Sequence, residues 1–171
     1  YASLRFGIET PRVGLLNIGE EDSKGNELAR EAHMLLRSEP RIDFVGNLEG
    51  RDLASDSADV VVTDGFTGNV ALKVVEGVAS MISRRLLEKL SSLSDDELKP
   101  VLPALLSLRG ELDYRAVGGA PLLGVRGVCI IAHGSSDALA IKNSLRVAAE
   151  AVRSGLVENT ERLLAPGSSG S

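Results

Sequence analysis

Strand-like apolar runs alternate with longer segments of helical periodicity along this chain, and that alternation limits the fold more than any other feature. The strand-like runs are RVGLLNIG (12–19), RIDFVG (41–46), ADVVVTDG (58–65) and GVCIIAHG (127–134). Helical patterns cover residues 24–38, 68–90 and 136–155. Because strands that alternate with helices are joined by crossovers, they pair in parallel. The sequence therefore predicts an α/β fold with a mostly parallel sheet and flanking helices.

One leucine-rich region, residues 84–110, interrupts this alternation. SDDE at 94–97 is typical of a capping box that starts a new helix, and Pro100 and Pro103 after it are expected to kink or restart that helix. The leucines fall on two helix faces: Leu86, Leu87, Leu90 and Leu93 on the first, Leu98, Leu102, Leu105 and Leu106 on the second. The pattern predicts a helical hairpin, which either packs on its own sheet or forms a subunit or membrane contact.

Both ends of the chain are irregular. YASLRF followed by Gly7 is typical of the last turn of a helix, so we expect the chain to begin partway through an element of a longer protein. APGSSGS (165–171) predicts a disordered tail or a cloning remnant. Residues 1–164 then suit one α/β domain or one large piece of a two-domain protein.

Charge and cysteine content narrow the class of protein. A net charge of −5 argues against a nucleic-acid-binding surface. Cys129 is the single cysteine and cannot form an intramolecular disulfide, so we expect a buried, inert thiol and an intracellular protein. No apolar run reaches the roughly 18 residues of a membrane span.

Three turns in the sequence have the same character. They are NIGEEDSKGNE (17–27), DGFTGN (64–69) and AHGSSDA (132–138), and each joins an apolar strand to a helix through glycine and small polar residues. Ligands of open α/β sheets bind beyond the carboxyl ends of the strands, which is where these turns fall. Parallel pairing would bring them to one edge of the sheet.

The composition of these turns favours anions. The first N–H groups of a helix lack intrahelical partners and carry partial positive charge, and glycine lets the backbone approach a ligand closely. Lys24 adds a full charge beside Gly25 and Asn26, and further donors are Thr67, Asn69, Ser135 and Ser136. Together the turns predict a phosphate site. Each turn taken singly is also explained as an ordinary helix N-cap.

The two histidines differ in their surroundings. His33 lies on the flank of a helix pattern and is expected to be structural. His133 ends a strand in front of Gly134, where it could act as donor, base or acid, or only hydrogen-bond a loop carbonyl. A triad of His133, Ser135 and Asp137 is excluded because residues so close in sequence do not reach that geometry. No cluster has metal-ligand spacing, and no metal or cofactor is expected.

Five segments resemble the C-terminal half of the PlsX family of bacterial phosphate acyltransferases. They are GLLNIGEEDSKGNELAREAH, FVGNLEGRD, DVVVTDGFTGNVALK, GGAPLLGV and AHGSSDALAIKNS, in the order of the family. The resemblance runs from about residue 1 to about residue 150. Members of the family are about twice this long, and their N-terminal Asp-Ala-Met-Gly-Gly-Asp motif is absent here. The resemblance thus implies half of a two-domain α/β enzyme, similar to isocitrate dehydrogenase and phosphotransacetylase.

The resemblance also implies a reaction and its partners. PlsX-type enzymes convert acyl-acyl-carrier-protein and inorganic phosphate into acyl phosphate and free carrier protein, in phospholipid synthesis. This implies a cytoplasmic homodimer, joined through the 84–110 hairpin, with peripheral contact to the inner face of the membrane.

The expected roles of the site residues follow from the anion chemistry and this reaction. Lys24, Gly25 and Asn26 are expected to hold phosphate, and Thr67, Gly68 and Asn69 to complete the anion pocket or the oxyanion site. His133, with Ser135 and Ser136, is expected to line the cleft from the other side, with His133 as proton donor.

Two other functions remain open from the sequence. The chain could be a non-catalytic module for oligomerisation or membrane docking, with the hairpin as its working surface. It could also be a phosphotransacetylase that acts on acyl-coenzyme A, although the leucine-rich hairpin favours a long-chain or carrier-bound substrate.

Overall fold

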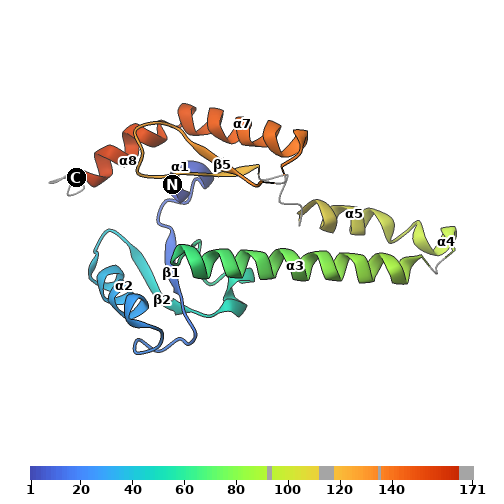
Figure 1. Ribbon diagram of the computed structural model, residues 1–171, viewed down its shortest axis with the longest axis horizontal. Helices are drawn as coiled ribbons and strands as arrows, with labels where there is room; N and C mark the ends of the chain where they lie inside the picture. Colours follow the sequence, from blue (N-terminus) through green and yellow to red (C-terminus); the bar gives the residue numbers. More distant parts are fainter. Residues whose placement is uncertain (92–93, 112–117, 135, 166–171) are drawn as a thin grey trace. The chain divides into compact units, whose positions relative to one another are not determined.

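The computed structural model describes residues 1–91, 94–111, 118–134 and 136–165 (Figure 1). The chain forms two compact units, residues 2–76 and residues 77–171 together with Tyr1. We call them the N-terminal and the C-terminal unit. The long helix α3 (Gly65–Leu90) runs from the first into the second. Residues 166–171 of the predicted tail (165–171) and Leu93 lie outside the described residues.

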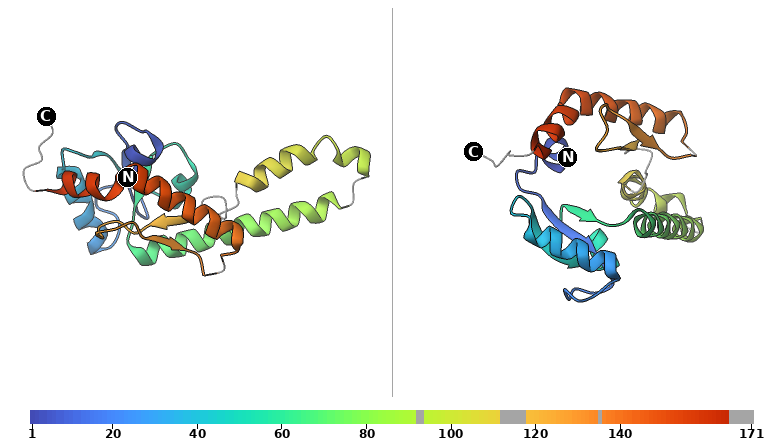
Figure 2. Two further views of the ribbon diagram at one scale, coloured as in Figure 1. Left: turned by 90° about the horizontal axis from the view of Figure 1, so that it is seen from above. Right: turned by 60° about the vertical axis from the view of Figure 1, so that its left-hand side comes forward.

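The N-terminal unit contains a parallel sheet of three strands. β1 (Arg12–Leu16) lies between β2 (Asp43–Leu48) and β3 (Val60–Val62). Both neighbours pair with it in parallel, with Leu15 opposite Asn47 on one side and opposite Val62 on the other. The helix α2 (Glu27–Ser38) packs on β2 and β1 (Figure 2). The predicted α/β class with a parallel sheet and flanking helices is confirmed.

Short elements complete the N-terminal unit. The helix α1 (Ala2–Phe6) ends at Gly7, whose φ of +70° and N–H bond to the Ser3 carbonyl (3.0 Å) confirm the predicted helix end. The 3-10 helix η1 (Gly50–Ala54) follows β2.

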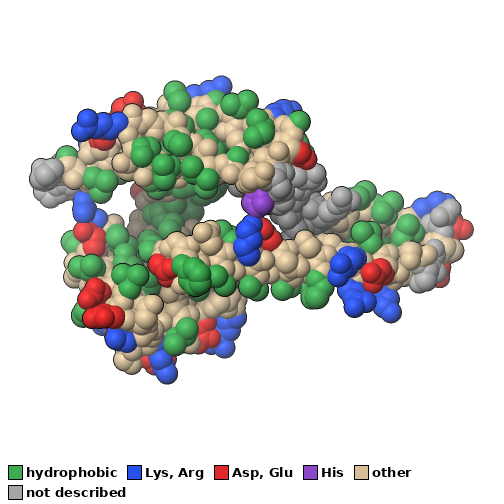
Figure 3. Space-filling view, in the orientation of Figure 1, with side chains coloured by type: hydrophobic (Ala, Val, Ile, Leu, Met, Phe, Trp, Pro, Cys, Tyr) green, Lys and Arg blue, Asp and Glu red, His purple; other side chains and the backbone are tan. Residues whose placement is uncertain are grey.

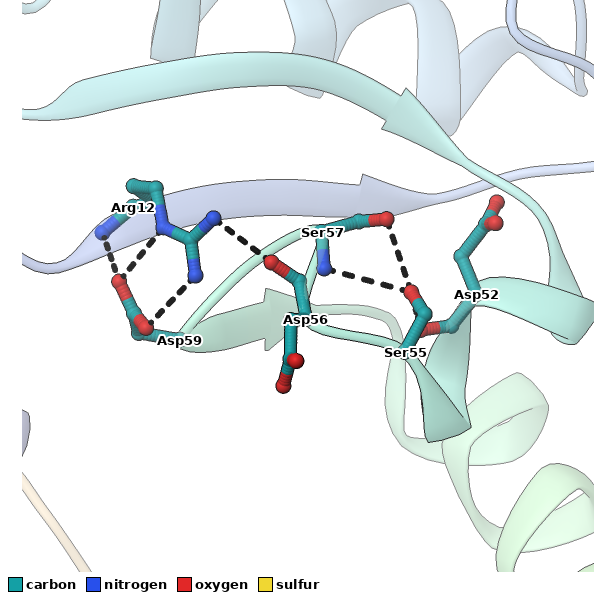
Figure 4. Close-up of polar contacts among 6 residues, drawn as sticks. All are labelled: Arg12, Asp52, Ser55, Asp56, Ser57 and Asp59. Atoms are coloured by element: carbon teal, nitrogen blue, oxygen red, sulfur yellow. Dashed lines mark hydrogen bonds and ion pairs between the residues drawn. The ribbon is translucent and has the colours of Figure 1, made fainter.

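An arginine fork joins the starts of β1 and β3. The Asp59 carboxylate accepts bonds from the backbone N–H (2.8 Å), Nε (3.1 Å) and one terminal nitrogen (3.0 Å) of Arg12. The other terminal nitrogen donates to the Asp56 carbonyl at 2.6 Å (Figure 4). The hydrogen bond to Arg12 is the main cause that holds the pKa of Asp59 below its usual range. The fork therefore ties β1 to the start of β3 through two residues that are 47 positions apart in sequence.

The leucine-rich region contains the helices that the sequence predicts. After α3, Ser94 and Glu97 form a capping interaction, in which the Ser94 N–H donates to the Glu97 carboxylate at 2.9 Å, and α4 (Asp95–Leu98) begins. The helix stops before Pro100, and α5 (Leu102–Glu111) starts beyond it. Apolar side chains lie on the visible surface of α5 (Figure 3). That this region forms a projecting hairpin stays a prediction.

The C-terminal unit has a different sheet from the one expected. β4 (Gly119–Pro121) and β5 (Ile130–Ala132) form an antiparallel pair covered by α7 (Ala138–Arg153). Gly118 at φ +92° allows close packing, because a Cβ there would lie 2.6 Å from the backbone nitrogen of Ser144 in α7. The run at 127–134 therefore pairs with a short strand that the periodicity did not reveal, and that strand approaches it from the opposite direction.

The helix predicted at 136–155 is present as α7, which ends just before Gly155 at φ +61°. A further helix that the pattern did not separate, α8 (Leu156–Leu164), follows Gly155. One other detail of this unit corrects the sequence analysis. Cys129 is exposed and not buried, because it precedes β5 in the loop that joins the two strands. The prediction of a buried thiol was wrong.

Candidate functional site

A pocket of about 490 Å³ lies where β1 and β3 end and α2 and α3 begin. Parallel pairing of these strands places their carboxyl ends at the same edge of the sheet, so the turns 17–27 and 64–69 meet there as predicted. The lining residues are Leu15, Leu16, Asn17, Ile18, Gly25, Asn26, Leu28, Ala29, Ala32, Val62, Thr63, Asp64 and Thr67. All of them belong to the N-terminal unit.

The α2 side of the pocket is built from Asn17, Gly25 and Asn26. Asn26 caps the helix, since its side-chain oxygen accepts from the Ala29 N–H at 2.8 Å. Asn17 donates to the Lys24 carbonyl at 3.1 Å and accepts from the Ile18 N–H at 2.8 Å. Gly25 sits at φ +90°, where a Cβ would lie 2.5 Å from the Asn17 side-chain oxygen. The backbone therefore approaches the pocket closely at Gly25.

The α3 side is dominated by Asp64. One carboxylate oxygen accepts from the N–H groups of Phe66 and Thr67, both at 2.9 Å, and the other accepts from the Thr67 hydroxyl at 2.5 Å. These bonds, with the Thr67 hydroxyl as the largest cause, hold the pKa of Asp64 below its usual range. The first donors of α3 thus already serve a carboxylate of the chain. An anion would find the α2 end of the pocket more accessible.

Only some of the predicted anion-binding residues line this pocket. Gly25, Asn26 and Thr67 line the pocket. Lys24 is half-exposed beside it, with Nζ 3.9 Å from a carboxylate oxygen of Glu21. Gly68 donates its N–H to the Asp64 carbonyl at 2.9 Å, and Asn69 is exposed on α3; neither is among the lining residues.

The third predicted turn lies in the C-terminal unit. His133 is exposed after β5, and its carbonyl accepts from both the N–H (3.0 Å) and the hydroxyl (2.6 Å) of Ser136. Asp137 caps α7 by accepting from the Ala140 N–H at 3.0 Å. Ser135 lies outside the described residues. The roles proposed for His133, Ser135 and Ser136 stay predictions.

Asn17 and Asp64 line the pocket and hydrogen-bond its turns, but they were not among the predicted site residues. Both follow the last residues of a strand, and Asp64 stands three positions before Thr67, the spacing of a side-chain cap. That spacing was the available signal for Asp64. No comparable signal marks Asn17, because its contact with Gly25 depends on the path of the loop between them.

The C-terminal unit has a cavity of its own, of about 320 Å³, between the β4–β5 loop and α8. It is mainly apolar, and Cys129 lines it together with Leu122, Val125 and Leu156. None of the predicted site residues takes part in it. Within the described ranges, no group of His, Cys and carboxylate side chains could hold a metal ion. In the same ranges, no helix has both the length and the apolar character needed to cross a membrane.

Comparison with known proteins decides the family. The model of the family described as "Fatty acid synthesis protein" matches residues 1–159. The chain belongs to this family. The resemblance to PlsX noted from the sequence is thereby confirmed.

Individual relatives agree with the family match. The chain is 51% identical over 166 residues to the phosphate acyltransferase of Halothermothrix orenii, covering 92% of this chain and 48% of that protein. It is 48% identical over 168 residues to the phosphate acyltransferase of Anaeromyxobacter dehalogenans, and the match covers 97% of this chain and 46% of that protein. It is 50% identical over 161 residues to the phosphate acyltransferase of Pelotomaculum thermopropionicum, and the match covers 93% of this chain and 47% of that protein. The chain spans about half the length of the curated relatives it matches.

Proposed function

We propose that this chain is part of a phosphate acyltransferase that forms acyl phosphate from acyl-acyl-carrier-protein and inorganic phosphate. One observation carries the proposal: the capped amino end of α2 and the Asp64 carboxylate face one pocket at the carboxyl edge of a parallel sheet, in a family whose relatives are named phosphate acyltransferases. The pocket exceeds the volume of one phosphate ion. Its apolar lining leaves room for the thioester end of an acyl group.

The reaction requires little covalent help from the protein. An oxygen of phosphate attacks the thioester carbonyl carbon and forms a C–O bond. The tetrahedral oxyanion then collapses, the C–S bond breaks, and the thiolate of the carrier protein leaves and takes up a proton. Positioning of phosphate and stabilisation of the oxyanion supply most of the acceleration in such a step.

The residues of the pocket divide this work. Backbone donors at Gly25 and Asn26, with Lys24 nearby, hold phosphate at the amino end of α2. Asp64 is an ionised acceptor, which favours a phosphate oxygen that still carries its proton. His133, with Ser135 and Ser136, is assigned the proton for the leaving thiolate. Of the predicted oxyanion residues, Thr67 and Gly68 already donate to Asp64, so Asn69 is left to supply the oxyanion donor.

The assembly follows the same proposal. The enzyme is a cytoplasmic homodimer joined through residues 84–110, with peripheral contact to the membrane. Exposed apolar side chains there support this: Leu87 is 62% exposed, Leu102 42% and Leu106 58%. A phosphotransacetylase that uses acyl-coenzyme A is the second candidate, since the pocket itself does not distinguish the two thioesters.

An acyl phosphate assay tests the proposal. The full-length protein that contains this chain is supplied with acyl-acyl-carrier-protein and phosphate, and acyl phosphate is trapped with hydroxylamine. We expect turnover by the full-length protein and little or none by residues 1–171, because the second wall that excludes water is missing. No product from the full-length protein would refute the acyltransferase, and faster turnover with acyl-coenzyme A would favour the second candidate.

A further inference from the structure

A buried histidine lies beneath the loop that forms the α2 side of the pocket. His33 on α2 is only 4% exposed, and its ring meets Phe44 of β2 edge-on, with centroids 5.1 Å apart. Both ring nitrogens face oxygen atoms. Nδ1 lies 2.9 Å from the side-chain oxygen of Asn47, and Nε2 lies 3.3 Å from Oδ1 of Asp22.

Asn47 fixes which ring nitrogen carries the hydrogen. Its amide nitrogen donates to the Glu21 carbonyl at 2.8 Å, so its oxygen is the atom turned to His33. An oxygen can only accept, and Nδ1 must therefore be the donor. In the neutral ring Nε2 then carries no hydrogen and exposes its lone pair. This nitrogen is buried, has no hydrogen-bond partner among the described residues, and faces the Asp22 carboxylate. A proton on Nε2 converts this contact into an ion pair.

Among the charged groups around His33, Asp22 is the one that faces the ring and can form an ion pair with it. β2 presents the uncharged Phe44 and Asn47 to the ring. In the loop, Glu20 and Glu21 turn their carboxylates to Arg51 and Lys24. Asp22 faces His33 and also pairs with Arg37 on α2. The Asp22 carboxylate thus joins the loop to two residues of one helix.

The same loop carries the phosphate-binding backbone. Asn47 and His33 hold Glu21 and Asp22, while Asn17 holds Lys24 and abuts Gly25. We propose that His33 is a positioning residue for this pocket: its protonation on Nε2 locks residues 21–26 through Asp22 and so strengthens phosphate binding. This inference rests on the proposed function, because it takes phosphate as the ligand of the pocket. The charge on Nε2 therefore decides how firmly the loop that carries the phosphate-binding backbone is held.

The first test needs neither phosphate nor a variant. In the full-length protein with ¹⁵N-labelled histidine rings, NMR spectra from pH 5.5 to 8.5 follow Nδ1 and Nε2 of His33. We expect Nδ1 to stay protonated throughout while Nε2 loses its proton. Hydrogen exchange in residues 17–26, corrected for the intrinsic effect of pH, should rise as Nε2 is deprotonated. A neutral ring protonated on Nε2, or exchange that does not follow the ring, would overturn the inference.

The second test uses matched variants and inorganic phosphate. Asp22→Asn removes the counterpart of His33, whereas Glu20→Gln removes a neighbouring carboxylate that faces Arg51. The ratio of wild-type to variant affinity at each pH cancels the ionisation of phosphate itself. We expect the ratio of wild-type to Asp22→Asn phosphate affinity to fall by at least about fivefold between pH 6 and pH 8. Fivefold is the lower end of the range by which one linked site usually changes the affinity of another. Glu20→Gln should behave as wild type.

The outcomes separate the two claims. Phosphate that fails to bind at any pH refutes the proposed function, while the NMR and exchange results still decide whether His33 holds the loop. Phosphate that binds wild type and Asp22→Asn with the same pH dependence overturns the inference and leaves the proposed function intact.

Discussion

At the scale of single residues, Gly25 is the position where the pocket depends most on a missing side chain. Replacement by alanine places a Cβ 2.5 Å from the Asn17 side-chain oxygen, at a φ of +90° that other residues rarely adopt. We expect Gly25→Ala to lower the free energy of unfolding by about 1–3 kcal/mol and to weaken phosphate binding. Urea denaturation measures the first effect. Gly50→Ala is the control, because a Cβ there meets no atom within 4 Å, and equal losses in both variants would contradict this account.

Lys24 tests whether a full charge contributes to the anion site. Its ammonium lies beside the pocket and close to Glu21, in reach of a ligand only if it turns away from that carboxylate. A charge-assisted contact contributes about 1.5–3 kcal/mol. Lys24→Ala should therefore weaken phosphate binding roughly tenfold to a hundredfold by calorimetry in the full-length protein. Lys99→Ala, an exposed lysine paired with Asp96, should change nothing, and an unchanged Kd for Lys24→Ala would remove Lys24 from the site.

The sequence revealed the pocket residues only in part. Asn26 and Thr67 could be predicted, because small polar residues at a helix start have few other roles. The sequence could not show that Asp64 caps the amino end of α3. The same backbone N–H groups would serve a side-chain cap or a bound anion. The network of His33 also escaped prediction, because it depends on a strand residue, Asn47, that lies 14 positions away.

At the scale of elements, the fork between Arg12 and Asp59 links β1 to β3. The pKa of Asp59 is lowered in the folded chain, so the unfolded chain binds a proton more readily. The stabilisation is therefore complete above the ordinary carboxyl range, near 3.9, and is lost as the pH falls through the lowered pKa. Asp59→Asn should be less stable than wild type at pH 7 and should lose less stability on acidification, as measured by thermal unfolding.

A neighbouring aspartate controls for this effect. Asp56 contributes only its backbone carbonyl to Arg12, and its carboxylate points away from the fork (Figure 4). Asp56→Asn should therefore keep the pH profile of wild type. If Asp56→Asn and Asp59→Asn shift stability alike, the fork has no special role.

The helices of residues 84–110 carry exposed apolar side chains, on which the proposed dimer depends. None of the 26 residues of α3 is buried, and Leu102 of α5 is 42% exposed. Burial of a leucine contributes roughly 1.5–3 kcal/mol, and one patch can serve both copies of a twofold dimer. Replacement of Leu102 and Leu105 by glutamate should give a monomer in sedimentation and abolish binding to liposomes.

The control for that variant lies in α8. Leu163 and Leu164 are 57% and 70% exposed, and their replacement by glutamate should leave both properties unchanged. A wild-type protein that sediments as a monomer and does not bind liposomes would contradict the dimer and the membrane contact together.

The sequence pattern predicted the strands of the N-terminal unit but not the strand pair of the C-terminal unit. The three strands of the N-terminal unit were predictable because each is followed by a helix or helical turn of the expected length. β4 was not, because its three residues include Gly119 and Pro121, which periodicity does not identify as strand. The antiparallel direction of β5 follows from that missed neighbour.

At the scale of the whole molecule, we propose that phosphate binds at the amino end of α2, beside Asp64. The decisive measurement is a crystal structure of the full-length protein soaked in phosphate. We expect density for the ion within hydrogen-bond distance of the backbone N–H groups that follow Gly25, inside the pocket lined by Asn17, Asn26 and Asp64. Density that appears only elsewhere, or a pocket that stays empty at saturating phosphate, would contradict the account.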